Sequence, residues 1–122
     1  MTIREAIARL DALVPNAYSP ENKVKWLSDL DGKIKKEIID THEGAETVIF
    51  EGYTEDNLDA VLLVPPEYDE LYMLWLEAKI DFSNKEYNRY NNSIVAFNTA
   101  YQAFDNYYNR THLPIQTKLK FF

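Results

Sequence analysis

Cysteine is absent from the 122-residue chain. Disulfide bonds, thiolate metal sites and cysteine nucleophiles are therefore excluded together. Glycine is nearly as scarce, with 3 residues, and neither a phosphate-binding glycine loop nor a nucleophile elbow occurs. The 5 prolines add few further turns, so the composition favours long helices over a strand-rich fold.

Long apolar runs are missing as well. No segment approaches the roughly 18 consecutive apolar residues that a membrane span requires. The charged start of the chain, Met1 to Glu5, does not resemble the apolar core of a signal peptide. We therefore expect a soluble, cytoplasmic protein with no membrane partner.

Positive charge is absent from the middle of the chain. The net charge is −7, and no Lys or Arg occurs between Lys36 and Lys79. This balance disfavours duplex binding, which needs clustered cations. The acidic stretch is either a solvated, self-repelling loop or a face that steers a basic partner or borders a passage for a polyanion. On the second interpretation the acids that would face such a passage are Glu43, Glu46, Glu51, Glu55, Asp56 and Asp59.

His42 and His112 are the only imidazoles. Neither is accompanied by a second ligand at metal-binding spacing, so we expect ordinary surface or capping residues and no metal. The acidic residues form no carboxylate pair in a recognisable apolar cleft, which general acid and base catalysis would require. The sequence thus predicts neither an enzyme nor a bound cofactor.

Two helix starts are well marked near the N-terminus. Thr2 and Glu5 have the spacing of a capping box, and apolar residues then recur every three or four positions up to Pro15. Ser19 before Pro20 marks the second start, and its apolar stripe continues to about Asp40.

Helical periodicity disappears between residues 41 and 64. Residues 47–51 and 60–64 are rich in β-branched and apolar side chains, with Gly52 and Asn57 between them. They are candidates for a short β-hairpin. Such a hairpin is barely stable alone, so it would have to lie on the helices or pair with another subunit.

The third predicted helix opens at Pro66 and runs to Phe82, and it is apolar nearly all round. It must therefore be central in the fold or covered by a second chain. A second capping box, Ser83 with Glu86, predicts a tight helical hairpin with a fourth helix of about 26 residues. The predicted fold class is a mainly α, small bundle of about four helices with a C-terminal helical hairpin.

The fourth predicted helix carries an aromatic seam opposite an Asn-rich face. Aromatic residues at helical spacing are usually core, but tyrosines also suit protein interfaces, where the hydroxyl reaches a polar group. Base stacking is disfavoured because no cation cluster lies nearby. From the third and fourth helices we select Tyr72, Leu76, Tyr107 and Tyr108 as interface candidates.

We expect one helical domain over residues 1–112 and a tail over residues 113–122. The tail alternates apolar and polar residues and ends in two phenylalanines, which is unusual for a free terminus. Its interface candidates are Ile115, Leu119, Phe121 and Phe122.

Several runs of the sequence resemble the small head–tail connector (adaptor, head-completion) proteins of tailed bacteriophages and prophages. The order of elements also fits, because a short helix and a proline-led helix containing Trp26 to Asp31 precede an irregular stretch and a helical hairpin. The runs that carry the resemblance are residues 66–72, 78–82, 86–92 and 97–104.

The resemblance implies a structural virion protein that forms a ring of about a dozen copies between the portal and the tail. Such a ring extends the DNA channel, DNA passes without specific binding, and the next connector or tail protein binds its far side. The C-terminal segment would dock into the portal. The expected location is the host cytoplasm during assembly and then the virion. The alternative function is a small acidic helical regulatory or chaperone-like module that binds one partner.

Overall fold

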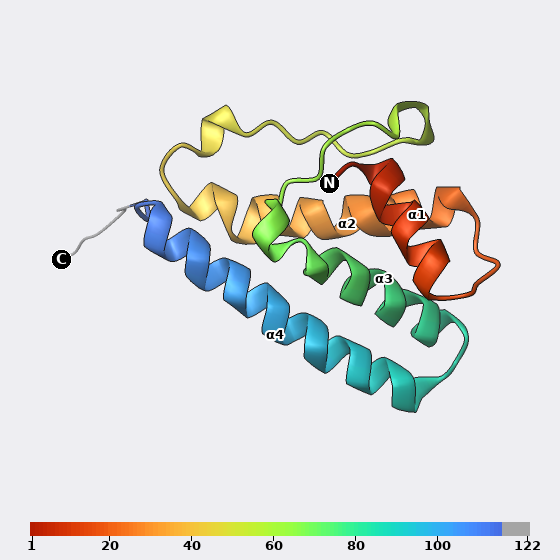
Figure 1. The fold of residues 1–122 in the computed structure, drawn as a ribbon. Helices are drawn as coiled ribbons and strands as arrows, with labels where there is room; N and C mark the ends of the chain where they lie inside the picture. Colours follow the sequence, from red (N-terminus) through yellow and green to blue (C-terminus); the bar gives the residue numbers. More distant parts are fainter. Residues whose placement is uncertain (116–122) are drawn as a thin grey trace.

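The computed structural model describes residues 1–115 and confirms the mainly α prediction (Figure 1). Four α-helices follow one another along the chain: α1 (Ile3–Leu13), α2 (Pro20–Glu37), α3 (Glu70–Ser83) and α4 (Tyr87–Thr111). Single turns of 3-10 helix lie between α2 and α3: η1 (Ile39–Thr41), η2 (Ala45–Thr47), η3 (Glu55–Asn57) and η4 (Pro66–Tyr68).

The first two helices begin where the sequence predicts. The Thr2 hydroxyl accepts a hydrogen bond from the Glu5 amide, and the Glu5 carboxylate accepts one from the Thr2 amide, which completes the capping box. Ser19 caps α2 by accepting from the Asn22 amide. The second helix ends at Glu37, slightly before the expected Asp40.

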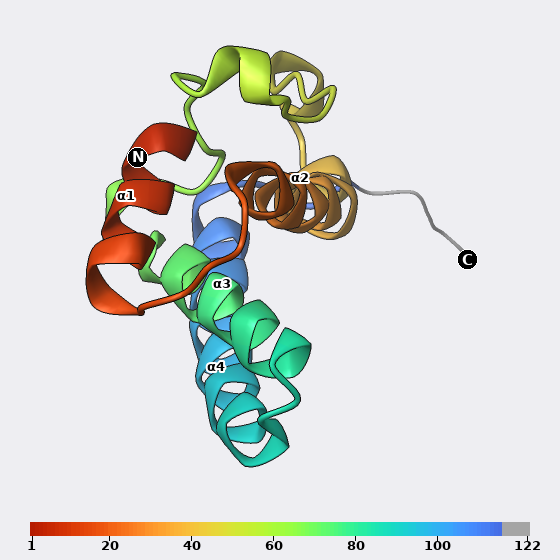
Figure 2. The same cartoon turned by 90° about the vertical axis from the view of Figure 1, so that its right-hand side faces the viewer.

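The third helix lies at the centre of the fold. It packs against α1, α2 and α4, and its residues Leu71, Tyr72 and Leu76 are fully buried. Figure 2 shows α3 between α1 and α2 on one side and α4 on the other. Other helices of the same chain therefore cover much of the apolar surface of α3, and a second chain is not needed for that purpose.

The helical hairpin is confirmed, but its predicted capping box is wrong. Ser83 belongs to the last turn of α3, and Glu86 caps α4 without a side-chain hydrogen bond. The turn is instead made by Lys85, which adopts a positive φ of 61°, and by a hydrogen bond from the Glu86 amide to the Asp81 carbonyl. The start of α3 is also later than predicted, because Pro66 opens the separate turn η4.

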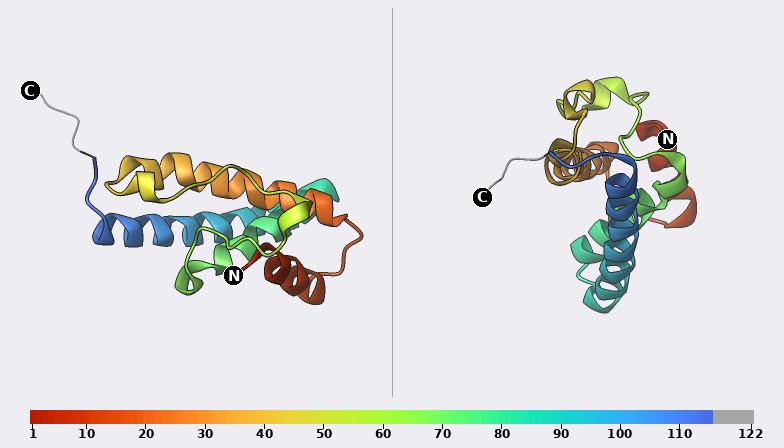
Figure 3. Two further views of the ribbon diagram at one scale, coloured as in Figure 1. Left: turned by 90° about the horizontal axis from the view of Figure 1, so that it is seen from above. Right: turned by 90° about the vertical axis from the view of Figure 1, so that its left-hand side faces the viewer.

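Residues 42–65, here called the acidic loop, do not form the β-hairpin. Within the described chain, residues 60–62 pair with the N-terminus instead: the Ile3 amide donates to the Ala60 carbonyl, and the Leu62 amide donates to the Met1 carbonyl. Residues 47–51 have no strand partner among residues 1–115. Seen from above, the loop runs back along α2 (Figure 3). A hydrogen bond from the Tyr53 amide to the Ser28 hydroxyl holds this part of the loop against α2.

A buried carboxylate fastens the acidic loop to the helices. Asp31 of α2 is 0% exposed. It accepts hydrogen bonds from the Tyr72 hydroxyl at 2.6 Å, from the Leu63 amide at 3.0 Å and from the Tyr53 hydroxyl. One acidic side chain thus joins α2, α3 and the loop, and its partners satisfy the polar group that burial would otherwise penalise.

Candidate functional site

The structure places most of the predicted interface residues of α3 and α4 inside the subunit. Tyr72 and Leu76 are 0% exposed and Tyr108 is 8% exposed, while Tyr107 is half-buried with its ring centroid 4.7 Å from that of Tyr68. The prediction that Tyr72, Leu76 and Tyr108 form an interface is therefore wrong. Tyr72 and Leu76 are buried because α3 lies between the other helices, and Tyr108 of α4 packs against Phe104 and His42.

The end of the described chain is anchored. The Glu43 amide donates to the Leu113 carbonyl at 2.8 Å, and the Ile115 amide donates to the Thr41 carbonyl at 3.0 Å. Ile115 itself is 47% exposed. The other predicted tail residues, Leu119, Phe121 and Phe122, lie outside the described residues.

His42 supports this anchor. His42 is 3% exposed; its Nδ1 lies 2.6 Å from the Ile38 carbonyl oxygen at the end of α2, and its Nε2 lies 2.7 Å from Oδ1 of Asn109 on α4. Of the two expected roles, surface or capping, the surface role is wrong for His42, and the contact with the Ile38 carbonyl is of the capping kind. The buried ring ties the end of α2 to the end of α4.

All six predicted channel-facing acids are exposed. Asp59 is paired with Arg4, whose Nε lies 3.0 Å from the carboxylate. The other five have no cation within 4 Å among residues 1–115: Glu43, Glu46, Glu51, Glu55 and Asp56. Beyond His42 and Glu43, which contact the end of α4 and the residues after it, the acidic loop runs on the side of α2 away from α4 (Figure 2). Most of its negative charge therefore accumulates at one side of the subunit.

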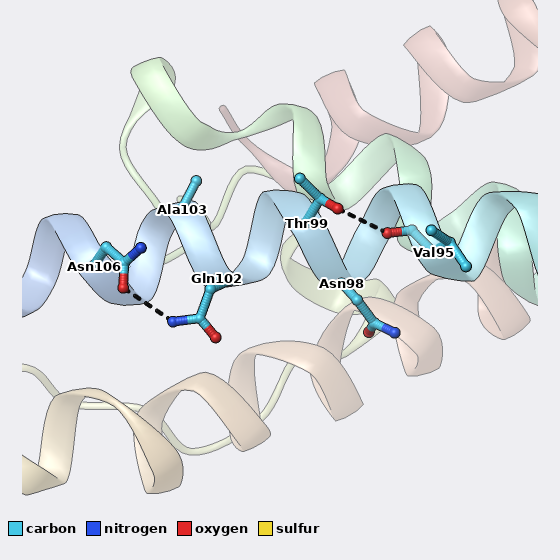
Figure 4. Close-up of a pocket in the computed structure, with 6 residues that line it drawn as sticks. All are labelled: Val95, Asn98, Thr99, Gln102, Ala103 and Asn106. Atoms are coloured by element: carbon cyan, nitrogen blue, oxygen red, sulfur yellow. Dashed lines mark hydrogen bonds between the residues drawn. The ribbon is translucent and has the colours of Figure 1, made fainter.

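The outer face of α4 has the opposite character. The twenty residues from Tyr90 to Asn109 include one charged side chain, Asp105, although charged residues make up 27% of the chain. A shallow hollow on this face is lined by Val95, Asn98, Thr99, Gln102, Ala103 and Asn106 (Figure 4).

Polar groups on this face are partly paired with one another. The Gln102 amide donates to Oδ1 of Asn106 at 3.0 Å, and the Thr99 hydroxyl donates to the Val95 carbonyl at 3.2 Å. A partner that covers the hollow would displace water from neutral groups and would have no ionised group of the lining to desolvate. Depletion of charge is typical of the core of a protein interface.

A second hollow, between α3 and α4 near their turn, was not found by sequence reasoning. We call it the hairpin groove; it encloses about 160 Å³ and is lined by Trp75, Ala78, Lys79, Phe82, Tyr90 and Ile94. Phe82 is 53% exposed, and its ring centroid lies 5.2 Å from that of Tyr90. The Lys79 ammonium lies 4.6 Å from the centroid of the Trp75 ring, within the range of a cation–π contact.

Residues 1–115 contain no group of three or more side chains of His, Cys, Asp or Glu placed to hold a metal ion. In the same part of the chain, no helix combines the length and the apolar composition that crossing a bilayer demands. The features that stand out are surfaces: one acidic loop, one uncharged helix face and one aromatic groove.

Neither a scan against models of protein families nor searches of curated proteins and of solved structures found a match to this chain.

Proposed function

We propose that the protein is a structural head–tail connector of a tailed phage or prophage, which assembles as a ring between the portal and the tail. The observation that supports this most directly is the division of its surface. The acidic loop carries five carboxylates with no cation within 4 Å among residues 1–115, whereas the exposed face of α4 is almost free of charge.

This division suits a subunit of a DNA passage. Carboxylates repel the phosphate backbone, so an acidic lining lets DNA slide without binding. An uncharged face costs little to desolvate and is suited to contact with neighbouring protein. A ring in which the acidic loops face the lumen and the α4 faces meet protein uses both surfaces at once.

The anchored C-terminal end contributes a third element. The hydrogen bonds between residues 41–43 and 113–115 fix Leu113 to Ile115 beside the acidic loop. In the proposed connector, residues 116–122 dock into the portal.

The acidic loop on its own also fits the alternative, a small regulatory or chaperone-like module that masks one basic partner. The two functions differ in stoichiometry. A connector forms a ring on its portal, whereas a regulator forms a small complex with a fixed and low number of chains.

Mixing the purified protein with the portal protein encoded in the same genome tests the proposal. Negative-stain microscopy and mass measurement should show rings seated on the portal. A chain truncated after Ile115 should keep its fold and lose portal attachment. A complex of one or two chains with no ring would contradict the connector and favour the regulator.

The channel role has a separate test. In assembled particles, replacing Glu43, Glu55 and Asp56 together by Lys should slow DNA packaging and ejection while rings still form. A matched control replaces three exposed acids outside the acidic loop, Glu67, Glu70 and Glu86, which should leave DNA passage unchanged. Equal behaviour of the two triple variants would remove the acidic loop from the channel.

A further inference from the structure

We propose that copies of this chain join head to tail, with Ile49 of one subunit seated in the hairpin groove of the next. These are the surfaces through which neighbouring subunits of the ring would join. Only the ring itself and its location in the virion rest on the proposed function. Self-association through these surfaces is a property of the chain and can be tested without a portal.

The acidic loop presents Ile49 outward. Val48 and Phe50 are half-buried, and Phe50 lies against Gly32 and packs edge-on to Tyr53 with centroids 5.0 Å apart. The backbone is extended at Val48, where neighbouring side chains point to opposite sides, and the alternation of burial over residues 48–50 directs Ile49 away from the body. Its side chain is 79% exposed.

A single exposed isoleucine is common on protein surfaces and indicates nothing alone. The acids around it are more informative. Glu46 and Glu51 lie within three residues of Ile49, are exposed, and have no cation within 4 Å in the described part of the chain. A partner that receives Ile49 should therefore offer an apolar hollow with positive charge at its edge.

The hairpin groove has both properties. Its walls are the rings of Trp75, Phe82 and Tyr90, and its volume of about 160 Å³ resembles the apolar cavity of about 150 Å³ that accepts a benzene-sized group. Lys79 lines it, Lys85 follows at the turn, and neither has a carboxylate within 4 Å among residues 1–115. An apolar side chain flanked by carboxylates matches this groove in size and in charge.

The two surfaces cannot meet within one chain. The acidic loop and the turn between α3 and α4 lie on opposite sides of the molecule (Figure 2). A contact between different patches on successive copies is heterologous, and it gives a ring when the rotation closes. The contact uses Glu46 and Glu51, and leaves Glu43, Glu55 and Asp56 for the passage.

Photo-cross-linking tests the contact directly. A benzophenone amino acid placed at position 49 keeps the side chain apolar, and in a mixture of isotopically heavy and light protein it should cross-link to residues 75–94 of another copy. The matched control places the same group at Leu13, which is 64% exposed on α1 and should give no cross-link to that region. Cross-links from position 49 that lie elsewhere, or none at concentrations up to about 1 mM, would overturn the proposal.

Charge reversal supplies a second readout by sedimentation. Glu51→Lys and Lys79→Glu should each weaken self-association about threefold, the range of an exposed ion pair, and the doubly reversed protein should recover most of the loss. Ile49→Asp should weaken it about tenfold or more, and Leu13→Asp should not. A double variant no better than the singles would exclude the pairing of these charges.

The cross-linking and portal-binding experiments can fail independently, so they test this contact and the proposed function separately. Cross-linking between position 49 and the hairpin groove without any portal binding would keep the contact and reject the connector. Portal-bound rings with cross-links from another surface would keep the connector and reject the contact.

Discussion

The acidic loop and the α3–α4 hairpin are held in place by different kinds of interaction. The loop has no regular strand or long helix, and its position depends on hydrogen bonds to Asp31, to Ser28 and to the N-terminal residues. The hairpin depends on packing: Leu76, Phe97 and Phe104 are at most 2% exposed. Directional bonds at a few points fix the loop, whereas apolar area distributed along two helices fixes the hairpin.

This difference indicates how each region would fail. Loss of one apolar side chain from the hairpin leaves many others in contact, so the cost is that of a cavity. Loss of Asp31 removes three hydrogen bonds at once and leaves buried donors without acceptors. The loop is therefore expected to depend on fewer residues than the hairpin does.

The largest effect is expected for Asp31→Ala. The substitution leaves the buried Tyr72 hydroxyl and the Leu63 amide without their acceptor, and we expect a loss of about 3–5 kcal/mol in the free energy of unfolding. Urea denaturation measures the loss, and hydrogen exchange should show the greatest change in residues 42–65. Asp29→Ala, which removes an exposed ion pair with Lys25, is the control and should cost less than about 0.5 kcal/mol. A loss of that small size for Asp31→Ala would refute the role of the carboxylate.

Leu76→Ala tests the hairpin and the correction of the predicted interface. Because Leu76 is 0% exposed, we expect a loss of about 2–5 kcal/mol in unfolding free energy. Val95→Ala, at a residue 63% exposed on the outer face of α4, should change stability by less than about 0.5 kcal/mol. If Leu76→Ala impaired assembly at unchanged stability, the residue would belong to an interface after all.

Truncation separates the anchor from the rest of the tail. A chain ending at His112 loses the hydrogen bonds of Leu113 and Ile115 to the residues around His42, and it should be less stable by about 1–3 kcal/mol. A chain ending at Ile115 keeps both bonds and should unfold at nearly the same urea concentration as the full chain. Equal stability of the two truncated chains would show that the anchor contributes nothing.

The smallest effect is expected from pH. Burial raises the pKa of Asp31 and is the largest influence on it; hydrogen bonds from Tyr53, Tyr72 and Leu63 oppose the rise. A raised pKa in the folded state means that the folded protein binds the proton more tightly than the unfolded chain does. This contribution to stability is present below about pH 3.8, the ordinary value for Asp, and is lost as pH rises through the folded-state pKa.

The comparison with Asp31→Asn isolates this contribution, because Asn does not titrate. As pH rises from about 3.8, the stability of the wild type relative to Asp31→Asn should decrease, as measured by urea midpoints at successive pH values. A wild type that gains stability relative to Asn over this window would mean that the hydrogen bonds outweigh burial and that the pKa is lowered.

Much of the helical architecture could be predicted from local sequence. Thr2 with Glu5 and Ser19 with Pro20 act on amides within three residues of them, so the starts of α1 and α2 follow from short-range chemistry. The aromatic spacing of α4 likewise indicates which of its faces packs, because Phe97 and Phe104 are buried, although Tyr108 on the same seam was expected at an interface. The second predicted box failed because Ser83 lies in the last turn of α3, and the residue that precedes α4 is Glu86.

The candidate surfaces could be predicted only in part. The exposure of the acidic residues follows from the cost of burying unpaired charge, but the pairing of Asp59 with Arg4, 55 positions apart, depends on the fold. The side chains of Tyr72 and Leu76 suit a protein core and a protein interface equally well, so the sequence could not predict that they are buried within the subunit. The hairpin groove combines residues of α3 and α4, and no sequence pattern within either helix predicts it.

The sequence by itself determined the helices, their apolar faces and the concentration of negative charge between Lys36 and Lys79, because these depend on neighbours within a few residues. Only the tertiary structure decided that Asp31 is the buried link to the acidic loop, that residues 60–62 pair with the N-terminus, and that α3 is the central helix. Those outcomes depend on which distant segments share a hydrogen bond or an apolar contact, and the free energy of such contacts is fixed by packing in three dimensions.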